Sequence, residues 1–471
     1  MMMNSMSTVE LRPYQEDGLE RIRNSYRSGH RAPLYVAPPG AGKTRLFARI
    51  CSGAAQRATR VLILAHRTEL VDQISQALSD ENCSHSYIAA GYPYRDDSGV
   101  YVASVFTVAK RLHHFNPDLI IVDEAHHAIA RTIWGKVLEA YPHAKVLGVT
   151  ATPERLSGEG LDDLFDDLIV GPTHEELIAQ GFLTPVRIYA PPTINTDEIG
   201  TRAGDYIASE LERLDQPRIT GDCIAHYRRI TPGARAIVFD ISVEAAKHRA
   251  EGFKAAGFTA ECIDGSTPRD VRAVAIASFR AGRLQVLTSC DLISEGFDLP
   301  AIEVGICLRP TQSLALWLQQ SGRVLRPFPG KSHAVIFDHA GNTLRHGLPT
   351  ETRSWSLAGA AAVAHRDLAR RSLRTCSSCF AVSPANAVVC RECGKAFPVK
   401  PRDVREAKGE LEELTPERLA QRLVMNRKRQ EQGRAGTYEA LVNLGRMRGM
   451  KHPDRWATHV MAARAAKRRI G

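Results

Sequence analysis

Short apolar runs alternate with longer amphipathic stretches from about residue 8 to residue 340. A first series of runs covers residues 34–37, 61–65, 100–105, 119–122 and 146–149, and a second covers 236–239, 284–288, 304–308 and 334–337. Apolar runs without polar alternation are typical of parallel strands that are buried on both faces. The pattern therefore predicts an α/β protein with two consecutive parallel-sheet units.

The segments outside these two units have different patterns. Residues 171–205 contain four prolines and predict a linker, and the Ala- and Arg-rich residues 358–374 predict a helix. We divide the chain into a first domain (8–175), a linker (176–209), a second domain (210–345), a connector (346–372), a cysteine module (373–397), a charged hinge (398–415) and a basic C-terminal segment (416–471).

The net charge of the chain is concentrated at its C-terminus. The 471 residues carry a formal net charge of +10, and residues 416–471, with fourteen Lys and Arg against four Asp and Glu, account for all of it. This segment also has an apolar pattern that predicts a small helical unit. Its basic residues are interpreted as a surface that contacts backbone phosphates, a docking surface for an acidic partner, or a solvated basic face, and the sequence leaves these three open. No apolar run reaches the roughly 20 residues of a membrane span, and no signal peptide is apparent, which predicts a cytoplasmic protein.

A glycine-rich stretch follows the first apolar run. Residues 37–44 read Ala-Pro-Pro-Gly-Ala-Gly-Lys-Thr and precede a predicted helix over residues 45–52. Glycines let backbone N–H groups close around phosphates, and a helix N-terminus adds the positive end of its dipole. In such a loop Lys43 reaches the β- and γ-phosphates and Thr44 binds Mg²⁺. The flanking strand and helix favour this interpretation over an ordinary turn.

Two acidic residues, Asp123 and Glu124, end a later apolar run 80 residues after Lys43. A carboxylate at the C-terminal end of a buried strand is placed to hold Mg²⁺, which suits Asp123. Glu124 is then placed to orient or deprotonate the attacking water. Together, the two stretches predict hydrolysis of a nucleoside triphosphate.

The ordered motifs of the chain resemble those of superfamily 2 helicases and translocases. Asp123 and Glu124 belong to Asp-Glu-Ala-His, and other short stretches before and after it occur along the chain in the family's order. They are residues 11–15, 65–70, 104–107, 150–153, 238–240, 264–267, 287–289, 295–298 and 319–326. The resemblance covers about residues 8–345 and implies two tandem RecA-like P-loop domains that close over ATP.

The resemblance also implies roles for individual residues. The expected catalytic residues are Lys43, Asp123, Glu124, Arg323 and Arg326, the last two as arginine fingers. The expected ATP and Mg²⁺ ligands are Arg12, Gln15, Pro39, Gly40, Ala41, Gly42, Lys43, Thr44, Asp123, Gly296 and Asp298, with Gln15 on the base. Thr150, Thr152 and Gln319 are expected to couple the two domains. Arg67, Thr107, Gly265 and Thr288 are expected to contact nucleic acid.

The final motif indicates the branch of the family. Residues 319–323 read Gln-Gln-Ser-Gly-Arg, which is similar to the DNA-acting group of RadD-like proteins and type I and type III restriction motors, whereas RNA-acting DEAD-box proteins have His-Arg-x-Gly-Arg there. The resemblance implies an ATP-dependent helicase or translocase of bacterial or phage origin that acts on single-stranded or branched DNA in repair or replication. Three alternatives stay open: an RNA helicase, a restriction-type motor subunit, and an ATP-switched nucleic-acid-binding adaptor that does not unwind.

Four of the ten cysteines are clustered as two Cys-x-x-Cys pairs, Cys376 with Cys379 and Cys390 with Cys393. Four thiolates can surround one tetrahedral Zn²⁺ and leave no open position, so the pairs predict one structural zinc in a ribbon. The sequence alone leaves open whether this ribbon touches DNA, binds a partner protein or braces the motor. The other six cysteines are single and are expected to be reduced thiols.

Overall fold

The structure is a computed structural model. It describes residues 10–95, 98–112, 115–155, 158–190, 201–202, 205–206, 222–290, 299, 301–359, 373–384, 387–390, 392–397, 431–432, 435 and 437–468. The chain divides into two compact units, Met1–Val399 and Lys400–Gly471, which are described separately.

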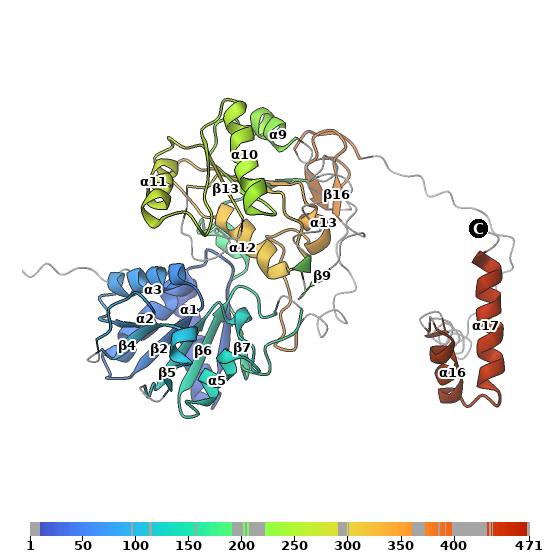
Figure 1. Ribbon diagram of the computed structural model, residues 1–471, viewed down its shortest axis with the longest axis horizontal. Helices are drawn as coiled ribbons and strands as arrows, with labels where there is room; N and C mark the ends of the chain where they lie inside the picture. The colour runs from blue at the N-terminus through green and yellow to red at the C-terminus, as the bar shows by residue number, and fades with distance from the viewer. Residues whose placement is uncertain are drawn as a thin grey trace, which may run out of the picture. The chain divides into compact units, whose positions relative to one another are not determined.

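The first domain is built on a seven-stranded sheet in which every neighbouring pair is parallel (Figure 1). Its order is β3 (Ser86–Ile88), β4 (Val100–Ser104), β2 (Val61–Ala65), β5 (Leu119–Asp123), β6 (Lys145–Thr150), β1 (Pro33–Val36) and β7 (Asp167–Val170). The five apolar runs of the first series therefore form strands as predicted. Because the strands are parallel, the loops that follow β1, β2, β5 and β6 meet at one edge of the sheet.

Helices cover both faces of this sheet. α1 (Pro13–Arg27), α2 (Lys43–Ala55) and α3 (Thr68–Asp80) pack on the face that carries Tyr35 and Ile63. α4 (Val105–Val108) and α5 (Ile133–Glu139) pack on the face that carries Leu34 and Leu62. Adjacent residues of a strand point to opposite faces, so β1, β2 and β5 are buried at every position, which explains their unbroken apolar sequences.

The second domain has a parallel sheet of six strands. The order is β12 (Ala260–Cys262), β13 (Val286–Ser289), β11 (Ala236–Phe239), β14 (Val304–Cys307), β15 (Ala334–Asp338) and β8 (Val186–Tyr189). α9 (Cys223–Ile230) and α10 (Val243–Ala255) cover one face, and α11 (Arg269–Arg280) and α12 (Leu314–Val324) cover the other. One contiguous buried cluster joins Ile22 and Leu46 of the first domain to Phe279 and Trp317 of the second, so the two domains pack against each other on this side.

The structure differs from the sequence-based division in the segments between domains. The expected linker contains most of α6 (His174–Ala179) and also β8, which is the edge strand of the second sheet. The connector returns to the first domain, where the Leu357 carbonyl accepts hydrogen bonds from the backbone of Leu161 and Asp162. Residues 373–374 lie in a short strand, β16 (Leu373–Thr375), instead of the predicted helix, because they pair with β17 (Val382–Pro384) of the cysteine module. Residues 360–372 of that predicted helix, and the charged hinge, lie outside the described residues.

The C-terminal unit contains a helical hairpin. α16 (Tyr438–Met447) and α17 (Pro453–Arg468) pack together around Leu441, Val442 and Ala457, as the apolar pattern of this segment predicts. Of the helices in the described parts of the chain, none combines the length and apolar character that crossing a membrane requires.

Candidate functional site

The loop between β1 and α2 has the conformation that a phosphate-binding loop needs. Gly40 and Gly42 have φ angles of +87° and +75°, a left-handed conformation that side chains disfavour, and Lys43 begins α2. The first backbone N–H groups of a helix have no partner within it, so the start of α2 offers donors to an anion. Ala41, between these two glycines, is buried.

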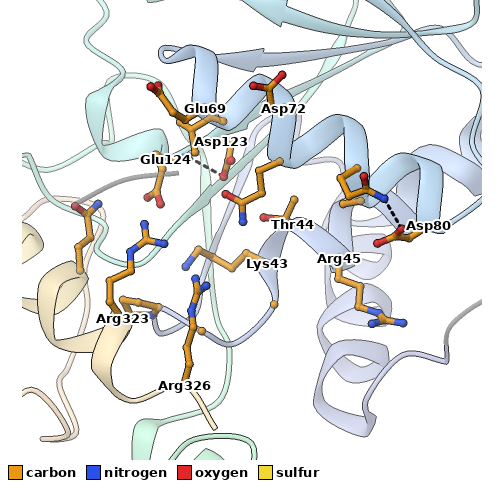
Figure 2. A pocket seen from close by; sticks show the side chains of 18 of the residues that line it. Lys43, Thr44, Arg45, Glu69, Asp72, Asp80, Asp123, Glu124, Arg323 and Arg326 are labelled. Atoms are coloured by element: carbon orange, nitrogen blue, oxygen red, sulfur yellow. Dashed lines mark hydrogen bonds between the residues drawn. The ribbon is translucent and has the colours of Figure 1, made fainter. Parts of the chain in front are cut away.

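Lys43 lies at the centre of the site (Figure 2). Its Nζ donates to the carbonyls of Ala37 at 3.0 Å and Pro38 at 3.4 Å. Burial lowers the pKa of Lys43, and the carboxylates of Glu124 and Asp123 act in the opposite direction. The binding of a polyanion such as a triphosphate would stabilise the charged form of this desolvated lysine.

Asp123 is the last residue of β5 and is almost fully buried. Its Oδ1 accepts a hydrogen bond from the backbone N of Glu124 at 3.0 Å. Glu124 follows in a left-handed conformation with φ of +47°, which turns its carboxylate toward the same cavity. Such a strained position in a non-glycine residue is common at functional sites.

Arg323 and Arg326 approach from the second domain. Arg323 lies near the end of α12 and Arg326 follows it, and both side chains point toward Lys43 in Figure 2. This approach is close: a Cβ at Gly322 would lie 2.3 Å from Cβ of Pro39 in the first domain. A glycine at position 322 therefore lets α12 meet the phosphate loop.

These groups line one cavity of about 820 Å³ between the two domains. Among the predicted residues, it is lined by Arg12, Pro39, Gly40, Gly42, Lys43, Thr44, Asp123, Glu124, Gln319, Arg323 and Arg326. Its size is in the range of small-molecule and cofactor sites. Gly296 and Asp298, which were also expected here, lie outside the described residues.

Two of the three residues expected to couple the domains, Thr150 and Gln319, contact His126, and the third, Thr152, contacts Thr150. His126 is buried, and its Nδ1 lies 3.0 Å from Oγ1 of Thr150 and 3.4 Å from Oε2 of Glu124. Its Nε2 lies 3.3 Å from Nε2 of Gln319, which belongs to the second domain. Oγ1 of Thr150 in turn donates to the Thr152 carbonyl at 2.8 Å. A hydrogen-bonded chain thus runs from Thr152 through Thr150 and His126 to Gln319 of the second domain, with Glu124 beside it.

A second polar link joins the domains. Nη1 of Arg272 on α11 lies 3.2 Å from Oε1 of Glu69 on α3. The other terminal nitrogen of Arg272 donates to the carbonyls of Asp264 and Thr267 at 3.2 Å each. One guanidinium therefore holds the loop after β12 and the first domain together.

The expected nucleic-acid contacts fall into two groups. Arg67, Thr107 and Gly265 lie at or just after the carboxyl ends of β2, β4 and β12 and are partly or fully exposed. Thr288 is different: its side chain is fully buried within β13, and its hydroxyl donates to the Ala246 carbonyl at 2.7 Å. A contact from the Thr288 hydroxyl to nucleic acid would require this bond to open.

The four clustered cysteines come together as predicted. All four Sγ atoms lie within 4.8 Å of one another, with 3.6 Å between Cys376 and Cys393 and 3.5 Å between Cys379 and Cys390. Thiolates at about 2.3 Å from a tetrahedral Zn²⁺ lie about 3.8 Å apart, so the donor set and its spacing fit one structural zinc.

The cysteine module docks on β8, the edge strand of the second sheet. Ala381 forms a bridge with Tyr189, and the backbone N of Ala190 donates to the Phe380 carbonyl at 3.0 Å. Tyr189 also packs against the buried cysteines of the module, and Arg187 forms a 3.4 Å ion pair with Glu392. The module is therefore an attached part of the second domain.

Sequence reasoning assigned no role to three residues that the structure brings to the site. The motif Asp-Glu-Ala-His contains His126 and could have suggested its role as a junction. Arg272 and Phe182 line the cavity but belong to none of the motifs identified in the sequence.

The fold and the site together define a P-loop nucleoside triphosphatase whose site is shared by two RecA-like domains.

Comparisons with known proteins agree with this class. Residues 8–155 match the model of the "Type III restriction enzyme, res subunit" family, and residues 219–327 match the "Helicase conserved C-terminal domain". A 51.5 kDa protein of Lactococcus phage (isolate 7-9) is 34% identical over 84% of this chain and 85% of its own length. The Saccharomyces cerevisiae protein IRC3, provisionally named an ATP-dependent helicase, is 28% identical over 71% of this chain. The chain spans about half of that yeast protein, 52%.

A solved structure supports the fold. A fragment provisionally named as an HsdR subunit of a type I restriction enzyme from Vibrio vulnificus YJ016 aligns with a TM-score of 0.57 and 19% identity, over 74% of this chain and 68% of the fragment. The chain belongs to the superfamily 2 helicases, and its activity class is that of a nucleic-acid-dependent ATP hydrolase.

Proposed function

We propose that this protein uses ATP hydrolysis to move on, or remodel, DNA in repair or replication. The observation that carries the proposal is the shared cavity: Lys43, Asp123 and Glu124 come from one domain, and Arg323 and Arg326 come from the other. A nucleotide that contacts both sets favours the closed arrangement, and its hydrolysis and release allow the domains to separate. That cycle changes the spacing of contacts at the carboxyl ends of β2, β4 and β12.

The residues of the cavity have distinct roles in this proposal. Lys43 and the backbone of the loop bind the phosphates, and Glu124 takes a proton from the attacking water as the new O–P bond forms and the bond to ADP breaks. Arg323 and Arg326 stabilise the charge on the transferring phosphoryl group. The hydroxyl of Thr44 and the carboxylate of Asp123 are hard oxygen ligands that suit Mg²⁺, which would neutralise phosphate charge.

The preference for DNA rests on residues 319–323 and on the match to a restriction-enzyme family. Single-stranded or branched DNA is the proposed substrate, and the cytoplasm of a bacterium, or of a cell infected by a phage, is the proposed compartment. The same family match favours a second candidate, a translocase motor that tracks along DNA without separating its strands. A zinc ion on Cys376, Cys379, Cys390 and Cys393 is proposed as a structural cofactor.

The test is ATP hydrolysis with single-stranded DNA, duplex DNA and RNA, together with strand displacement, for the wild type, Glu124→Gln and a control. Glu124→Gln should lower hydrolysis by about 10²- to 10⁴-fold while ATP still binds. Glu175→Gln, which changes an exposed acid on α6, should leave hydrolysis unchanged. Hydrolysis that no nucleic acid stimulates would refute the motor, and stimulation by RNA alone would refute the DNA assignment. Hydrolysis without strand displacement would favour the translocase.

A further inference from the structure

Arg326 lies beyond the helix that carries Arg323. α12 ends at Val324, whereas Arg326 is two residues further along the chain and is followed by Pro327. The last four carbonyls of a helix have no partner within it, so the chain that leaves α12 needs other contacts to hold it in place. These contacts determine how accurately the Arg326 side chain is directed at the phosphates.

The side chain of Lys331 supplies such contacts. The chain reverses at Gly330, which has a φ angle of +83°, and the backbone N of Lys331 donates to the Phe328 carbonyl at 3.0 Å. This turn brings the Lys331 side chain to the end of α12, where its Nζ donates to the carbonyl of Val324 and, at 2.8 Å, to that of Arg326. One ammonium group therefore binds the last carbonyl of the helix and the carbonyl of Arg326 itself.

A third hydrogen bond connects Lys331 to the second sheet. Its Nζ donates to the Ile302 carbonyl at 2.7 Å, and Ile302 lies two residues before β14 begins. An ammonium group has three N–H donors, so backbone carbonyls use all of them here. Nearby, Arg235 forms a 3.1 Å ion pair with Glu303 and lies over the Phe328 ring at 4.5 Å from its centroid. The end of α12 is thus attached to the start of a central strand.

The environment of Lys331 disfavours a charge. Burial lowers the pKa of Lys331 to about 7, the Glu303 carboxylate acts in the opposite direction, and the Arg235 guanidinium adds to the lowering. An apolar side chain of similar length would avoid this desolvation, but it would leave three carbonyls without their donor. The three hydrogen bonds to the backbone around Arg326 therefore account for a lysine at this position.

We propose that Lys331 is a positioning residue for ATP hydrolysis, because it fixes the backbone from which the Arg326 side chain reaches the transferring phosphoryl group. The inference rests on the proposed function, since it assigns a role to a residue that supports the same site. Lys331 is not among the residues that line the cavity, so it acts through Arg326 and not on the nucleotide. An arginine that stabilises charge formed in the transition state changes kcat, and a small misplacement of such a group lowers the rate strongly.

The first test compares ATP hydrolysis by the full-length wild type and by Lys331→Met at pH 6.5, where the charged form of the lysine predominates. Methionine keeps an unbranched side chain and removes the three donors. kcat should fall about tenfold, while KM for ATP changes by less than about twofold. Lys331→Gln keeps two N–H donors without the charge and should lower kcat about threefold. It also provides the comparison if Lys331→Met does not fold.

A second test shows whether Lys331 acts through Arg326. Arg326→Ala alone should lower the rate by about 10³-fold, and adding Lys331→Met should cause no further loss, because the group that the lysine positions is already removed. Single-turnover measurements at saturating single-stranded DNA give these slow rates. Phe253→Leu is the control for stability: it changes a buried ring of α10, on the other face of the second sheet, and should lower the unfolding temperature without lowering kcat.

Four results would overturn the inference. They are an unchanged kcat in Lys331→Met, a loss that appears in KM instead of kcat, an equal further loss when Lys331→Met is added to Arg326→Ala, and a fall in kcat for Phe253→Leu as large as that for Lys331→Met. The last of these would mean that destabilisation alone explains the effect. If no nucleic acid stimulates hydrolysis, the proposed function fails, and the same ratios between variants, measured without nucleic acid, still test the role of Lys331.

Discussion

At the scale of single residues, the hydrogen bonds around His126 define its protonation pattern. Oγ1 of Thr150 donates its one hydrogen to the Thr152 carbonyl, so it can only accept from His126 Nδ1. In a neutral imidazole, Nε2 is then an acceptor, which matches the Nε2 donor of Gln319 at 3.3 Å. An oriented hydrogen-bonded chain therefore runs from Thr152 through Thr150 and His126 to Gln319 on α12, and it passes beside Glu124.

Removing the contact between His126 and Gln319 should reduce the stimulation of ATP hydrolysis by nucleic acid more than it reduces basal hydrolysis. Gln319→Ala deletes the donor to His126 and should lower nucleic-acid-stimulated hydrolysis by about tenfold, a loss of about 1.4 kcal/mol, with basal hydrolysis little changed. The measurement is kcat with and without DNA for Gln319→Ala, His126→Ala and the double variant. If the two residues act through one bond, the double variant should lose no more than the worse single variant. Fully additive losses would contradict the link.

His174 predicts a dependence of stability on pH. It begins α6 and is 7% exposed, and burial, with the positive charges of Arg353 and Lys43, lowers its pKa to about 4. Between pH 6.5 and 4 the unfolded chain therefore binds a proton that the folded chain does not bind. The folded state should lose about 3 kcal/mol as the pH falls through this window and keep full stability above it.

Chemical unfolding of the wild type and His174→Gln at pH 7.5, 6.0 and 4.5 checks this expectation. The variant cannot titrate at this position, so its free energy of unfolding should fall less steeply with acidification. His248→Gln, which changes an exposed histidine on α10, should retain the wild-type slope. Equal slopes in all three proteins would show that His174 protonates as readily in the folded state as in the unfolded state.

At the scale of elements, the cysteine module covers the edge of the second sheet at β8. Exposed edge strands invite pairing with other chains, and the contacts of Tyr189 and Ala190 with the module cover the edge of β8. A module of this size is too small to fold on an apolar core of its own, so zinc binding is expected to supply its folding free energy. Zinc would then stabilise the motor as well as the module.

Cys390→Ser should therefore lower the zinc content from about one per chain to near zero and destabilise the second domain by about 1–2 kcal/mol, which lowers the unfolding temperature by about 3–6 °C. Calorimetry and metal analysis give the two quantities. Cys262→Ser changes a half-buried thiol of β12 that is not part of the cluster, and it should keep the zinc. If a zinc-free variant has a second domain that unfolds at the wild-type temperature, the module contacts β8 without stabilising the second domain.

Some of these elements could be predicted from the sequence and others could not. The strands that are buried on both faces, and the loop around Lys43, could be predicted because each has a local pattern. β8 could not, because its four residues are an edge strand whose partner, β15, lies far along the chain. Arg272 and Glu69 are 203 residues apart, and Arg12 and Phe182 meet only after the chain has crossed between domains. Such pairs form only when the chain folds, so no local sequence pattern predicts them.

At the scale of the whole molecule, the net charge and the motor belong to different units. Residues 416–471 account for the whole +10, whereas residues 1–415 carry no net charge. We therefore expect the motor to bind nucleic acid through individually positioned residues, for which Arg67 is a candidate, and not through a general positive field. The hairpin of the C-terminal unit exposes Arg446, Lys451 and Arg455 around its turn. Basic groups gathered in this way suit backbone phosphates, which they bind without regard to base sequence.

Neutralising this turn should weaken DNA binding and its dependence on salt. The triple variant Arg446→Gln, Lys451→Gln and Arg455→Gln removes up to three phosphate contacts, so the slope of log affinity against log salt concentration should fall by up to about 3 for duplex DNA. ATP hydrolysis without DNA should stay at the wild-type level, because the motor unit is unchanged. Lys254→Gln, on α10 of the motor, removes an exposed charge that is paired with Glu251 and serves as the control. An unchanged slope would assign the turn to an acidic protein partner, because a surface that releases no counterions from DNA does not bind its phosphates.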